Sequence, residues 1–85
     1  MRREPEFFGD TEMVLVYIAK RLDEALALED LLTKAEIDYA VEADRYKGGV
    51  MFMRERVGAF FYVLPEVEEQ VRETMNKGGY RPFDG

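Results

Sequence analysis

Ala59-Phe-Phe-Tyr-Val-Leu64, followed directly by Pro65-Glu66, is the stretch that decides the fold. Its six side chains are all apolar or aromatic. Because alternate side chains of a strand point to opposite faces, this pattern predicts a strand that is covered on both faces. Pro65 then ends the strand and suits the first turn of a helix. A second stretch, Met13-Val-Leu-Val-Tyr-Ile18, has the same character, so the two units predict a two-layer domain with a half-repeat.

Two segments have the apolar periodicity of helices that pack against a sheet. Residues 22–35 and residues 65–77 repeat apolar side chains at three- and four-residue steps. These side chains are Leu22, Ala25, Leu28, Leu32 and Ala35 in the first segment and Val67, Val71 and Met75 in the second. Acidic residues begin both segments and a lysine lies near each end, as the helix dipole favours. Gly78 is then expected to end the second helix in the left-handed conformation.

Two further strands are expected at the edges of the sheet. Residues 37–43 alternate more, as a strand with one wetter face does, and residues 80–83 contain Pro82, which suits an edge strand or a strand end. Residues 44–49 predict a loop, and residues 50–53 offer a further short strand.

The order of these elements is strand, helix, strand, strand, helix, strand. With right-handed crossovers it predicts a ferredoxin-like α+β fold, a βαββαβ two-layer sandwich. The predicted four-stranded antiparallel sheet has the order 4-1-3-2, with two helices on one face. Residues 1–12 are expected to form an N-terminal arm, and residues 13–85 a single domain.

Helices on one face leave the other face of this sheet uncovered. Apolar side chains remain on that face, whichever set faces the helices, and a large exposed apolar patch is unusual for a soluble monomer. Three covers are open: a second subunit, the segment 50–53 or the arm with Phe7 and Phe8, or a ligand. We expect a homodimer or a higher homo-oligomer. The interface would contain Leu15, Tyr17, Phe60 and Tyr62, although the two tyrosines also suit ordinary core positions.

The composition limits the chemistry that the chain can perform. With 18 acidic and 12 basic residues, the net charge of -6 repels phosphate backbones and anionic lipids, so we expect neither nucleic acid nor a membrane as partner. The chain contains no His, Cys, Ser or Trp. We therefore expect that the protein is not an enzyme and binds no cofactor, since the usual general base, nucleophiles and metal ligands are missing. The lack of thiols, of a signal peptide and of long apolar runs predicts a cytoplasmic protein.

A basic cluster surrounds the glycine pair in the middle of this acidic chain. It suggests an anion site for a phosphate or carboxylate, formed by Arg45, Lys47, Gly48, Gly49 and Arg54. The favoured alternative is a solvated hairpin whose bases pair with neighbouring acids. The acidic run Glu66, Glu68, Glu69 and Glu73 likewise predicts a solvated helix face rather than a metal site.

Four segments carry a family pattern: Leu15-Val-Tyr-Ile-Ala19, Leu22-Asp-Glu-Ala25, Ala35-Glu-Ile37 and Tyr62-Val-Leu-Pro-Glu66. Together they resemble a small bacterial family of signal-transducing proteins, over about residues 13–80. The resemblance implies a ferredoxin-like fold, related in outline to the nitrogen-regulatory signal proteins, and brings no catalytic residues. The chain departs from the family at Glu36, where the turn has a glycine, and in its basic middle loop.

These observations lead us to expect a non-catalytic regulatory or protein-interaction module, possible partners being other proteins as well as further copies of the chain. The alternative is a sensor of a small anionic molecule that uses the basic loop 45–56.

Overall fold

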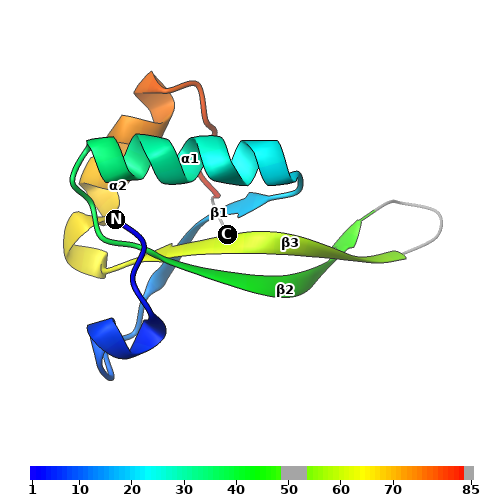
Figure 1. Ribbon diagram of the computed structural model, residues 1–85, viewed down its shortest axis with the longest axis horizontal. Coiled ribbons are helices and arrows are strands. Elements are labelled where there is room, and N and C mark those ends of the chain that lie inside the picture. Colours follow the sequence, from blue (N-terminus) through cyan, green and yellow to red (C-terminus); the bar gives the residue numbers. More distant parts are fainter. Residues whose placement is uncertain (49–53, 84–85) are drawn as a thin grey trace.

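The computed structural model describes residues 1–48 and 54–83. Within these residues, two α-helices pack on one face of a three-stranded antiparallel sheet of order β1-β3-β2, which confirms the predicted α+β class (Figure 1). The strands are β1 (Val14–Ala19), β2 (Ala40–Gly48) and β3 (Arg54–Val63). The helices are α1 (Leu22–Lys34) and α2 (Glu68–Lys77), and two short 3-10 turns are η1 (Pro5–Phe8) and η2 (Pro65–Val67).

The prediction of a fourth strand at residues 80–83 is wrong, and with it the four-stranded order 4-1-3-2. This segment touches β1, where the Phe83 N–H donates a hydrogen bond of 2.6 Å to the Val16 carbonyl, but in the described part of the chain it forms no strand. Two local constraints account for this. The Tyr80 N–H donates to the Met75 carbonyl at the end of α2, and Pro82 has no N–H to donate. β1, predicted to be central, is therefore an edge of the described sheet.

β3 is the centre of the sheet, as its unbroken apolar sequence predicts. It pairs with β1 along residues 59–63 and with β2 along residues 54–62. β2 starts later than the predicted strand 37–43 and continues through residues expected to form a loop, because its charged second half goes on pairing with β3. The resulting hairpin extends beyond the helices (Figure 1). The expected short strand at 50–53 lies outside the described residues.

One hydrophobic core fills the space between the helices and the sheet. Both predicted apolar stripes contribute to it, and the fully buried side chains include Leu28 and Leu32 of α1 and Val71 and Met75 of α2. The first residue of the predicted stripe is an exception, since Leu22 is 75% exposed. It stands at the first position of α1, where it lines a surface recess instead of the core.

Both helices end in a turn that needs one residue in the left-handed conformation. After α2 this residue is Gly79, with φ of 87°, rather than the predicted Gly78. Gly78 is constrained by close packing, because a Cβ atom there would lie 2.7 Å from Cδ2 of Leu31 on α1. After α1 the left-handed residue is Glu36, with φ of 59°.

Candidate interaction site

The face of the sheet opposite the helices carries two apolar cross-strand pairs. Leu15 of β1 lies opposite Tyr62 of β3, and Ile18 lies opposite Phe60. All four side chains lie outside the core beneath the helices. Phe60 is 9% exposed, and the other three are half-buried. These four residues define the helix-free face, which brings together three of the predicted interface residues and adds Ile18.

Tyr17, the fourth predicted interface residue, lies on the other side of the sheet. The register between β1 and β3 shifts between Leu15 and Tyr17, and this bulge turns Tyr17 toward the helices. There it packs against the core and meets Tyr80 edge to face, with 5.6 Å between the ring centroids. Burial, together with the Glu24 carboxylate, raises the pKa of Tyr17. Strict alternation could not reveal this placement, because a bulge leaves no mark in a run of apolar residues.

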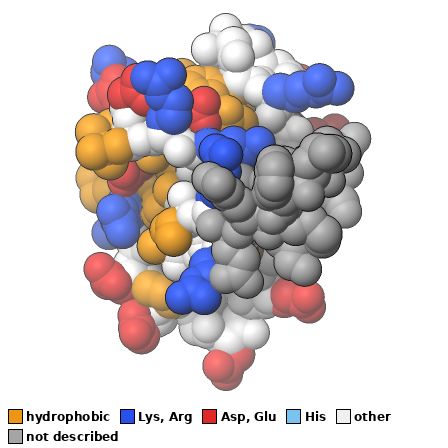
Figure 2. Space-filling model, turned by 90° about the vertical axis from the view of Figure 1, so that its right-hand side faces the viewer, with side chains coloured by type: hydrophobic (Ala, Val, Ile, Leu, Met, Phe, Trp, Pro, Cys, Tyr) orange, Lys and Arg blue, Asp and Glu red, His pale blue; other side chains and the backbone are white. Residues whose placement is uncertain are grey.

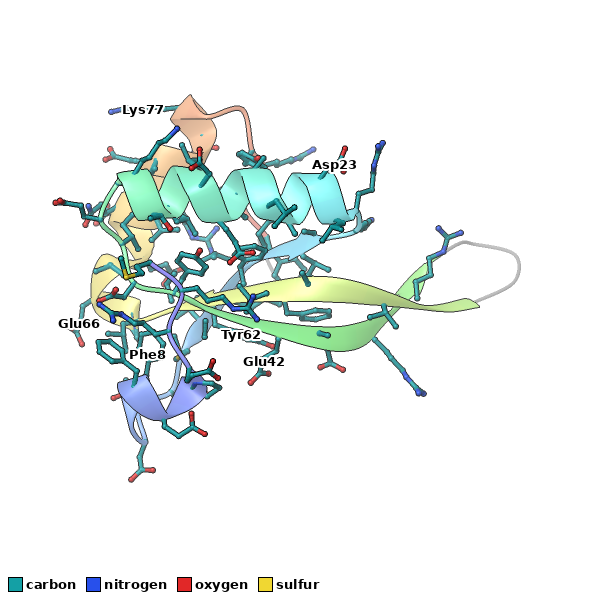
Figure 3. The ribbon with its side chains drawn as sticks, viewed as in Figure 1. Phe8, Asp23, Glu42, Tyr62, Glu66 and Lys77 are labelled. Atoms are coloured by element: carbon teal, nitrogen blue, oxygen red, sulfur yellow. The ribbon has the colours of Figure 1, made fainter. Side chains whose placement is uncertain are left out.

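The N-terminal arm covers one end of the helix-free face. η1 and the labelled Phe8 and Glu42 lie on the side of the sheet away from α1 (Figure 3). Phe8 is 7% exposed although it does not belong to the core beneath the helices. Between arm and sheet lies a recess of about 310 Å³, whose lining includes Pro5, Ala40 and Tyr62. Of the predicted covers, the arm is therefore present at one end of the face.

Tyr62 lines the recess beside the arm and lies near the acidic residues of β2. Burial raises the pKa of Tyr62, and the Glu42 and Asp44 carboxylates of β2 raise it further. Its hydroxyl is therefore protonated at neutral pH and can donate a hydrogen bond.

The predicted anion-binding residues lie in the outer half of the β2–β3 hairpin. The paired positions are Arg45 with Val57, Lys47 with Glu55 and Gly48 with Arg54. This register spreads the four described candidates along two extended strands, with an acidic residue opposite Lys47. Gly49, the fifth candidate, lies outside the described residues. The anion site stays a prediction.

A second apolar surface, which the sequence did not indicate, lies between the start of α1 and the hairpin. This α1 recess has a volume of about 280 Å³, and its lining includes Ala19, Ala25, Val41, Ala43 and Ala59. Leu22 and Val57 also line it and are 75% and 66% exposed. Its rim is basic, because the lining also includes Arg2, Lys20 and Arg21. Figure 2 looks onto this end of the molecule and shows hydrophobic side chains gathered together with Lys and Arg. Three alanines meet here because Ala19 and Ala43 both pair with Ala59, a register that the sequence does not reveal.

The described residues, 1–48 and 54–83, contain no group of three or more acidic side chains placed to hold a metal ion. At residues 1–45 and 56–83, no charged side chain is buried. Within the same ranges, every helix is too short or too polar to cross a membrane. The acidic start of α2 includes a half-buried ion pair, in which Glu68 accepts a hydrogen bond of 3.0 Å from Arg72.

No protein-family model, no curated protein and no solved structure matches this chain. The resemblance to the signal-transducing family therefore stays a prediction. The helix-free face and the α1 recess are two apolar surfaces of the molecule.

Proposed function

We propose that this protein is a non-catalytic interaction module that self-associates through the helix-free face. The observation that carries the proposal is the pair of apolar contacts, Leu15 with Tyr62 and Ile18 with Phe60, on a face that the arm covers only at one end. Complete burial of a large apolar side chain stabilises a structure by about 1.5–3 kcal/mol relative to exposure. Burial of the half-buried side chains in an interface would therefore stabilise a complex by part of this amount. A second copy of the chain offers a surface of the same kind.

The charges beside the helix-free face support a symmetric arrangement. Glu42 and Asp44 of β2 are exposed acids, and Arg56 of β3 is an exposed base. Because side chains alternate along a strand, Arg56 shares the face of Phe60. In a two-fold dimer, the arginine of one copy can approach the acids of the other. Such rim pairs contribute more to the orientation of a complex than to its affinity.

Sedimentation equilibrium at increasing protein concentration tests the proposal. We expect the average mass to rise with concentration for the wild-type chain. Ile18→Lys places a charge in the centre of the helix-free face, so this variant is expected to remain monomeric.

Leu26→Lys is the matched control, because Leu26 is an exposed leucine of α1 on the other side of the sheet. It should associate like the wild type. Circular dichroism would establish that both variants are folded. A wild-type chain that is monomeric at high micromolar concentration would disprove self-association, and equal association of both lysine variants would exclude this face.

A further inference from the structure

The outer edge of the sheet at β2 already accepts a short strand from the chain itself. The Arg3 N–H donates a hydrogen bond of 2.8 Å to the Tyr39 carbonyl, and the Tyr39 N–H donates one of 3.1 Å to the Met1 carbonyl. These bonds form a parallel bridge between Arg2 and Tyr39, just before β2 begins. Beyond this bridge, no strand of the described residues pairs with the outer edge of β2.

Val41 and Ala43 continue this edge. Alternate residues of a strand direct their main-chain groups to the same side, so these two residues present N–H and C=O outward, as Tyr39 does. Both side chains line the α1 recess. A strand added to this edge would therefore gain main-chain hydrogen bonds and place alternate side chains beside the recess.

The residues of β2 that alternate with Val41 and Ala43 make the other side of this edge, away from the α1 recess, acidic. Glu42 and Asp44 are both exposed, and they alternate with Val41 and Ala43 along the strand. The side chains of an added strand that do not face the α1 recess would lie beside these two carboxylates. Lysine or arginine at those positions would complement their charge.

We propose that the outer edge of β2 binds an extended peptide segment of a partner protein, added as a strand parallel to β2. Apolar side chains of this segment would occupy the α1 recess, and alternating basic side chains would lie beside Glu42 and Asp44. A second copy of the chain fits this edge less well. Two-fold pairing of β2 with itself would bring the acids of both copies to one face, where like charges repel.

This edge shares Glu42 and Asp44 with the rim of the helix-free face, but it uses none of the four residues that define that face. Because peptide binding and self-association are measured separately, the two proposals can still fail independently. Fluorescence polarisation would measure binding of a labelled, capped peptide with the repeat Lys-Val-Lys-Val-Lys. The comparison peptide has glutamate in place of every lysine. We expect the glutamate peptide to bind at least about tenfold more weakly, because it brings acids to the acidic side of the edge.

Two variants test the main-chain and charge contributions separately. Ala43→Pro removes one outward N–H, a change that edge strands tolerate, and should weaken binding of the lysine peptide about tenfold. The double variant Glu42→Lys with Asp44→Lys should reverse the preference between the two peptides. It keeps the test decisive if the proline variant does not fold. Ile18→Lys, on the helix-free face, should bind the lysine peptide as the wild type does.

Amide chemical shifts would locate the peptide. We expect the largest changes at Val41 and Ala43. No binding at millimolar peptide, equal affinity for both peptides, or shift changes centred on Leu15 and Phe60 would overturn the proposal.

Discussion

The two faces of the sheet are built from the same strands but are covered differently. Phe60 and Phe61 are neighbours on β3 whose side chains point to opposite faces. Phe61 is completely buried beneath the helices, where Tyr39 stacks on it with 5.8 Å between the ring centroids. Phe60, on the helix-free face, is 9% exposed, and its cross-strand neighbours Ile18 and Glu42 are half-buried and exposed, respectively. Similar side chains thus form a closed core on one side and an incomplete one on the other.

The order of the elements explains this difference. β1 and β2 are both antiparallel to β3 and hence parallel to each other, and α1 connects them by crossing one face of the sheet. α2 packs on the same face, beside α1. Among the described residues, only the segment before β1 reaches the opposite face, and it covers one end. The rest of that face is the surface that the proposed self-association would cover.

A comparison of Phe61→Ala with Phe60→Ala should give the largest difference in stability between the two faces. Loss of the completely buried Phe61 ring is expected to lower the free energy of unfolding by about 3–5 kcal/mol, measured by urea denaturation. Phe60→Ala should lower it less, because the cross-strand neighbours of Phe60 are the half-buried Ile18 and the exposed Glu42. The same variant should abolish association in sedimentation. Phe61→Leu replaces the alanine variant if that variant does not fold. Normal association of Phe60→Ala would contradict the role given to this face.

Removal of a buried ring from the arm should have an intermediate effect on stability, because the arm covers only one end of the helix-free face. Phe8→Ala is expected to lower the free energy of unfolding by about 2 kcal/mol, the value of one buried large side chain. Phe7→Ala is the matched control. Phe7 is 56% exposed, so its loss should change stability by less than about 0.5 kcal/mol. Equal effects of the two variants in urea denaturation would show that the arm does not pack on the sheet through Phe8.

Alkaline pH should lower the free energy of unfolding through tyrosines on both faces of the sheet, by less than the substitutions above. Burial raises the pKa of Tyr39 on the helix side and of Tyr62 on the helix-free face above the ordinary value of 10.0. As the pH passes 10, the unfolded chain loses these protons before the folded chain does, so the free energy of unfolding should be constant near neutrality and fall above pH 10.

Urea denaturation of Tyr39→Phe and Tyr62→Phe as a function of pH would assign this fall. Each variant lacks one titrating hydroxyl, so its stability should decline less steeply than that of the wild type. A wild-type stability that rises above pH 10, or slopes that do not change in either variant, would contradict the burial of these hydroxyls.

The sequence predicts the helices, β1 and the central position of β3 because each depends on a local apolar pattern. It misses the length of β2, whose charged half is held by pairing with β3 rather than by its own pattern. The edge strand predicted at residues 80–83 does not form for a similar reason. The Tyr80 N–H is bonded to the end of α2, and Pro82 has no N–H for strand pairing.

The candidate surfaces are predicted less completely than the fold. Alternation groups Leu15 with Tyr17 and Phe60 with Tyr62, but it does not say which face the helices cover. The bulge before Tyr17 then moves that residue to the other face. The α1 recess depends on how three strands align their alanines, and the exposure of Leu22 depends on where α1 begins relative to the sheet. Such features are set by register, which local patterns do not specify.

Glu36→Gly should give the smallest effect and separate stability from association. Glu36 and Gly79 occupy equivalent left-handed positions after the two helices. The Ile37 N–H donates to the Leu32 carbonyl at 3.0 Å in the first turn, and the Tyr80 N–H to the Met75 carbonyl at 2.8 Å in the second. A side chain in this conformation costs roughly 1 kcal/mol, which glycine avoids.

We therefore expect Glu36→Gly to raise the free energy of unfolding by about 1 kcal/mol and Gly79→Ala to lower it by a similar amount. Neither position belongs to the helix-free face, so sedimentation should give both variants the association constant of the wild type. If association instead follows these changes in stability, the loss of association in Ile18→Lys would reflect weaker folding rather than an altered contact. The glycine substitution thus decides whether the uncovered face acts as a binding surface or only as a weak part of the fold.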